Sequence, residues 1–151
     1  ISLLGRAPGN NWFYVQTTDG FTGWMKMEGI ELDGNFYDAP EVTPDRVVIV
    51  RGRMFGTNGS PASDLSLMIQ PKGDDTTSMQ DVGRTDVTGR FYIYLPEGTR
   101  GEWTLALAAY GCESSAVDRN CSLIGKFPEP SLITLPDAAE TELEFHLLPL
   151  N

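Results

Sequence analysis

From residue 47 onward the chain consists of short segments in which apolar and polar side chains alternate. In the first segment Val48, Val50 and Met54 occupy one side of the alternation. Later segments repeat this pattern, with the side chains expected to point inward being Leu65, Leu67, Ile69, Phe91, Ile93, Leu95, Trp103, Leu105, Leu107, Ala109, Leu143, Phe145 and Leu147. A period of two is typical of strands with one buried face, and no segment has the helical period of 3.6. The pattern predicts an all-β protein with an antiparallel β-sandwich over residues 47–151.

Two glycine-containing turns lie between the predicted strands of the first half of this region. The sequence NGSP occupies residues 58–61 and TDVTGR occupies residues 85–90. Glycine tolerates a positive φ, so Gly59 and Gly89 are predicted to adopt one. Asp86 is predicted to accept a hydrogen bond from the backbone of its own turn.

The spacing of strands and turns resembles a known domain family. A V-x-G-x-M segment at 50–54, the turn at 58–61, an L-x-L-x-I segment at 65–69 and the turn at 85–90, followed by Phe91, are similar to the carboxypeptidase regulatory-like domain. The resemblance covers residues 47–110 and departs in the long segment 111–141. It implies a seven-stranded sandwich of the transthyretin type, serving stability, spacing or binding without a catalytic role.

The first 32 residues predict a β-hairpin. Residues 12–17 alternate in polarity, residues 18–20 are a Thr-Asp-Gly turn, and residues 21–27 form the returning strand. The sequences GRAPGNNWFYV at 5–15 and DGFTGWM at 19–25 resemble the second half of a bacterial SH3-like domain, a small β-barrel module of cell-envelope proteins. This resemblance implies that the first half of the barrel is not in this chain. We therefore expect a piece of a longer exported protein, with any signal or anchor upstream of Ile1.

Residues 33–46 have no apolar periodicity and are predicted to be a linker. Pro40 and Pro44 favour extended backbone at the residues before them. The adjacent aromatics Phe36 and Tyr37 are expected to pin this linker to a neighbouring surface, because exposed aromatic pairs are unusual in a free tether.

The net charge of −10 argues against two classes of partner. Affinity for nucleic acid depends largely on Lys and Arg displacing counterions, so nucleic acid is not expected, and anionic lipid surfaces are disfavoured for the same reason. No apolar run approaches the roughly 18 residues of a membrane-spanning helix, so no transmembrane segment is predicted.

Cys112 and Cys121 bracket a polar loop and are predicted to form a disulfide. Closing this loop would constrain the unfolded chain by about 2.7 kcal/mol on the loop-entropy model. Two unpaired buried thiols and a catalytic thiol are the alternatives, whereas zinc would need two further ligands that the lone His146 cannot supply. A bridge implies an oxidising, extracytoplasmic compartment.

No catalytic, metal or cofactor site is expected. His146 lies out of phase with the inward row, beside Glu144, which is typical of an exposed strand histidine. Asp74 and Asp75 could offer oxygen ligands to calcium, but they lack the ordered spacing of a calcium loop and favour a solvated one. Hydrolase elbows, phosphate loops and metal-binding histidine pairs do not occur.

Trp12, Tyr14, Phe21 and Trp24 are the aromatic cluster most suited to ligand recognition. Flat aromatic surfaces bind sugar rings and peptide stems, although alternating aromatics on a short hairpin often form its core. We predict a non-enzymatic binding or spacer module of an exported, cell-envelope-associated protein, recognising cell-wall peptide or glycan, or another protein. The alternative is a structural module that self-associates into a homo-oligomer through open strand edges.

Overall fold

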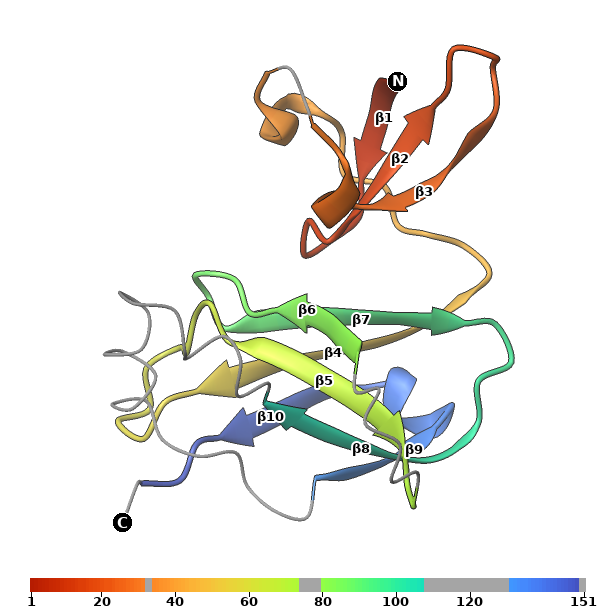
Figure 1. Ribbon diagram of the computed structural model, residues 1–151. Helices are drawn as coiled ribbons and strands as arrows, with labels where there is room; N and C mark the ends of the chain where they lie inside the picture. Colours follow the sequence, from red (N-terminus) through yellow and green to blue (C-terminus); the bar gives the residue numbers. More distant parts are fainter. Residues whose placement is uncertain (32–33, 74–79, 108–130, 150–151) are drawn as a thin grey trace. The chain divides into compact units, whose positions relative to one another are not determined.

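The computed structural model describes residues 1–31, 34–73, 80–107 and 131–149, and this part of the chain is all-β (Figure 1). Its regular elements are strands and three-residue 3-10 turns, namely η1 (Met27–Gly29), η2 (Phe36–Asp38) and η4 (Asp137–Ala139). The chain divides into two compact units, Ile1–Asp45 and Arg46–Asn151, here called unit 1 and unit 2.

Unit 1 contains a three-stranded antiparallel sheet. Its strands are β1 (Ser2–Arg6), β2 (Trp12–Gln16) and β3 (Thr22–Lys26), in the order β1-β2-β3. The predicted hairpin is present as β2 and β3. β1 was not predicted, because its sequence does not alternate and its pairing with β2 shifts register between Leu3 and Gly5.

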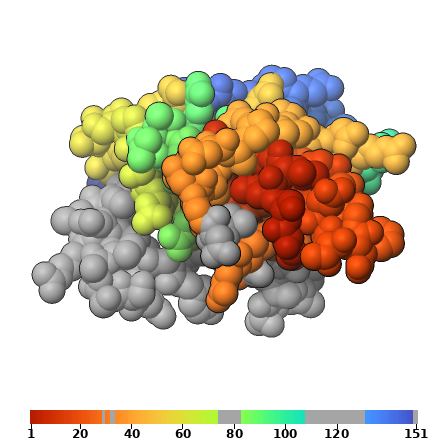
Figure 2. Space-filling view, turned by 90° about the horizontal axis from the view of Figure 1, so that it is seen from above, coloured from red at the N-terminus to blue at the C-terminus, as the bar shows by residue number. Residues whose placement is uncertain are grey.

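Much of the segment predicted as a linker, residues 33–46, packs on unit 1. The Phe36 ring lies 5.5 Å from the fully buried Phe13 ring, so it covers the core of the unit. The Arg6 amide donates to the carbonyl of Pro40 (3.0 Å), and the Val42 amide donates to the carbonyl of Arg6 (2.8 Å). Figure 2 shows this segment, in light orange, beside the red residues at the start of the chain. The unit boundary accordingly lies after Asp45.

Unit 2 is a β-sandwich, as the sequence predicts. One sheet has the order β10-β4-β7 and the other the order β6-β5-β8-β9 (Figure 1). Side chains from both sheets form one apolar core. The strands are β4 (Val47–Phe55), β5 (Ser66–Pro71), β6 (Gln80–Arg84), β7 (Arg90–Pro96), β8 (Gly101–Leu107), β9 (Leu132–Leu135) and β10 (Glu142–His146). All pairs are antiparallel except β10 with β4, which is parallel.

The core of unit 2 contains most of the side chains predicted to point inward. The residues of that set that are less than a tenth exposed are Val50, Met54, Leu65, Leu67, Ile69, Phe91, Ile93, Leu95, Leu105 and Leu147. Val48, Trp103, Leu107, Leu143 and Phe145 are partly buried against them. Ile133 and Leu135 of β9 complete the core and were not predicted, and Ala109 lies outside the described residues.

The two predicted turns have the expected chemistry. Gly59 has φ of 80° and Gly89 has φ of 76°, both in the left-handed region that favours glycine. Asp86 Oδ1 accepts hydrogen bonds from the backbone amides of Thr88 (2.8 Å) and Arg90 (3.0 Å). These local predictions are confirmed.

Within the described residues, no helix is long and apolar enough to cross a membrane. Cys112, Cys121, Asp74 and Asp75 lie outside the described residues, so the predictions made for them stay predictions.

Candidate functional site

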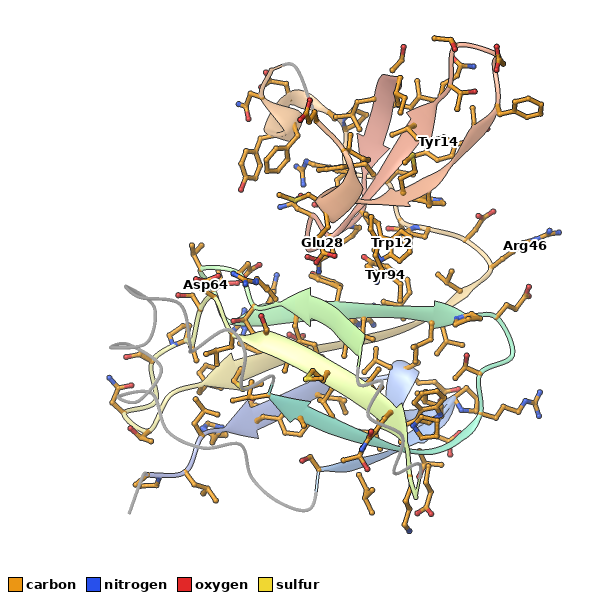
Figure 3. All side chains as sticks on the ribbon, viewed as in Figure 1. Trp12, Tyr14, Glu28, Arg46, Asp64 and Tyr94 are labelled. Atoms are coloured by element: carbon orange, nitrogen blue, oxygen red, sulfur yellow. The ribbon has the colours of Figure 1, made fainter. Side chains whose placement is uncertain are left out.

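Three of the four predicted aromatic residues lie on one face of the sheet in unit 1. Tyr14 on β2 is directly opposite Trp24 on β3, and Trp12 is opposite Lys26. Alternate residues of a strand point to the same face, so Trp12, Tyr14 and Trp24 share one side and Phe13 and Val15 take the other. Figure 3 labels Trp12 and Tyr14 on this unit. We call Trp12, Tyr14 and Trp24 the aromatic face.

The three residues of the aromatic face are partly exposed, whereas Phe13 and Val15 behind them are 0% and 2% exposed. Phe13 and Val15 therefore form the core of the hairpin, and the residues of the aromatic face are only partly covered by packing. This arrangement leaves ring surface available to a ligand.

The aromatic face has a defined internal geometry. The ring centroids of Tyr14 and Trp24 are 5.2 Å apart, with their planes tilted by 40°. Lys26 Nζ lies 5.7 Å from the ring centroid of Trp12, a cation–π arrangement that extends the face with a positive charge. Gln16 and Thr22, opposite one another on the same side, add polar groups beside the rings. Apolar rings bordered by hydrogen-bonding groups are characteristic of ligand surfaces.

Phe21 does not belong to the aromatic face. It precedes β3, and its amide donates to Thr17 Oγ1 (3.1 Å) across the turn, which places it in phase with Val15. Phe21 is 74% exposed. The sequence-based set of four residues thus divides into three that the sheet brings together and one isolated at the hairpin turn.

His146 is exposed, as its phase in the sequence predicted. Its Nε2 lies 2.7 Å from Glu144 Oε1, and its ring stacks on Phe55 with centroids 5.0 Å apart. In the part of the chain that the structure describes, no group of three or more His, Cys, Asp or Glu side chains is placed to hold a metal ion.

No protein-family model, curated protein or solved structure matches this chain. The resemblances to the bacterial SH3-like and carboxypeptidase regulatory-like families therefore remain predictions.

Proposed function

We propose that this chain is a non-enzymatic binding module of an exported, cell-envelope-associated bacterial protein, and that the aromatic face recognises cell-wall peptide or glycan. The observation that supports this proposal is the partly exposed Tyr14 and Trp24 pair beside Trp12 on one sheet face. Such rings stack on the apolar faces of sugars and on peptide stems, and burying one large aromatic ring removes some 150–250 Å² from water. In this proposal unit 2 is an accessory or spacer sandwich of the transthyretin type.

Retention on purified peptidoglycan tests the role of the aromatic face. The wild-type chain is expected to bind, and Trp12→Ala and Trp24→Ala are each expected to weaken binding at least tenfold, as loss of a central aromatic contact does. Phe21→Ala is the matched control, because it removes an exposed aromatic ring that lies off the face. Equal retention of Trp12→Ala, Trp24→Ala and the wild type would exclude the aromatic face as the binding site.

The proposed extracellular setting predicts that Cys112 and Cys121 are bridged. Thiol titration of denatured protein, purified without reductant, is expected to detect no reactive thiol before reduction and two after it. Two reactive thiols before reduction would contradict the disulfide and remove this support for export.

An assembly role is the second candidate, supported by the edge position of β3. In the described residues no strand pairs with the outer side of β3, and unpaired backbone groups of an edge strand are a template for another chain. Light scattering at increasing protein concentration is expected to show a rising mass if β3 pairs between copies. A constant monomer mass would exclude this role.

A further inference from the structure

The outer face of the β10-β4-β7 sheet brings two arginines and two glutamates around one hollow. The strand register aligns Glu144, Arg53 and Arg90 in a row across the three strands, with Glu142 two residues away on β10. These four side chains and Leu143 line a hollow of about 210 Å³. None of these residues was predicted to have a binding role, because the sequence alone does not show that β10 pairs with β4.

The arginine pair is electrostatically unfavourable without a counterion. Arg53 and Arg90 are directly opposite each other on β4 and β7, and like charges at such positions destabilise a sheet. In addition, Nε of Arg53 is buried without a hydrogen-bond acceptor among the described residues. A buried donor left unpaired destabilises the fold, and more so when it is charged.

The neighbouring carboxylates relieve this arrangement only in part. Glu142 Oε1 lies 3.9 Å from Arg90 Nε, too far for a hydrogen bond, while Glu144 Oε1 is engaged by His146 Nε2 at 2.7 Å. Within the described residues, Arg53 forms no ion pair. The hollow therefore contains a guanidinium with an unpaired Nε–H, on Arg53, and a weakly engaged carboxylate, on Glu142.

We propose that this hollow binds a small zwitterion, a free amino acid, with its carboxylate held by Arg53 and Arg90 and its ammonium held by Glu142 and Glu144. A guanidinium that turns towards a ligand carboxylate gives its Nε–H an acceptor in the two-point geometry that arginine favours. A simple anion would meet the repulsion of the two glutamates, and a simple cation that of the two arginines. The hollow is smaller than the roughly 300–1,000 Å³ of pockets for drug-sized ligands, which fits a ligand of amino-acid size.

An NMR titration of the full chain with alanine tests this proposal, with propionate and ethylamine as ligands that each retain one charge. Alanine is expected to shift the Arg53 and Arg90 Nε–H signals with a dissociation constant on the order of 1 mM. Propionate and ethylamine are expected to bind at least tenfold more weakly. An absence of saturable shifts with alanine, or equal affinity for propionate, would overturn the proposal.

Two variants and one control assign the binding to the hollow. Arg53→Gln removes a charge that faces the carboxylate of the ligand, and Glu142→Gln removes a charge that faces its ammonium. Each substitution is expected to weaken alanine binding at least tenfold. Arg100→Gln is the control, because it removes an exposed arginine beyond the far end of β7. Thermal melting establishes that each variant is folded. Wild-type affinity in folded Arg53→Gln or folded Glu142→Gln would contradict the assignment.

Discussion

Gly52 shows how a single residue fixes the packing of the sandwich. A Cβ atom at this position would lie 2.6 Å from the carbonyl oxygen of Leu143 on β10 and 2.6 Å from Cζ of Phe91 on β7. Backbone on one side and a fully buried ring on the other leave little room to adjust. The close pairing of β4 with both neighbours therefore requires glycine here.

Gly52→Ala is expected to lower the free energy of unfolding by about 1–3 kcal/mol, the usual cost of overpacking a tight core. Gly23→Ala is the control, since Gly23 also lies in a strand and a Cβ atom there would have no neighbouring atom within 4 Å. Urea denaturation measures both. A Gly52→Ala protein as stable as the wild type would contradict the close approach of β10 and β4.

Asp86 is the second residue whose chemistry is local and testable. Its Oδ1 accepts from the Thr88 amide, the Thr88 hydroxyl (2.7 Å) and the Arg90 amide. Asp86→Ala is expected to destabilise the protein by about 1–2 kcal/mol, because three hydrogen bonds of the turn are lost. The loss is limited to this size because the exposed donors can bond to water instead. Asp86→Asn keeps an acceptor oxygen and should recover more than half of the loss in thermal melting. Equal stability of the Ala and Asn variants would show that the acceptor is unimportant.

At the level of elements, the alternation of side chains identifies the strands and their buried faces but not their partners. β4, β5, β7, β8 and β10 follow from the period of two. β1, β6 and β9 do not, because none of them shows a sustained alternation of apolar and polar side chains. The parallel pairing of β10 with β4 depends on tertiary contacts, as does the packing of residues 34–42 on unit 1. The prolines and the lack of periodicity predict that this segment is irregular, but they do not predict where it packs.

Phe36→Ala tests the docking of this irregular segment on unit 1. Removing the ring that contacts Phe13 is expected to cost about 1–3 kcal/mol, less than a fully buried phenylalanine because Phe36 is only partly buried. Tyr37→Ala is the comparison, since Tyr37 is 60% exposed and should cost less. Hydrogen exchange at the Val42 amide, which donates to Arg6, should accelerate in Phe36→Ala. Unchanged exchange at Val42 would contradict the docking role.

For the whole molecule, the sequence predicts that the candidate site lies in the hairpin, but it does not predict which residues form the site. The period of two places Trp12 and Tyr14 together, and the register of β3 adds Trp24. Phe21 was included in the sequence-based set because it is aromatic and close in the chain. Its spacing of three residues from Trp24 already indicates the opposite side of the strand, and its pairing with Thr17 agrees. The mixed-charge hollow of unit 2 was not predicted, because its residues come from three strands far apart in sequence.

The central claim, ligand recognition by the aromatic face, is tested most directly by the indole N–H signals of the three tryptophans in an NMR titration with soluble peptidoglycan fragments. Trp12 and Trp24 are expected to shift saturably. Trp103 is an internal reference, because it lies in unit 2 and its Nε1 donates to the carbonyl of Arg100 at 3.1 Å. Saturable shifts at Trp12 and Trp24 with an unchanged Trp103 are the predicted result. Shifts confined to Trp103, or no shift at any of the three, would contradict the claim.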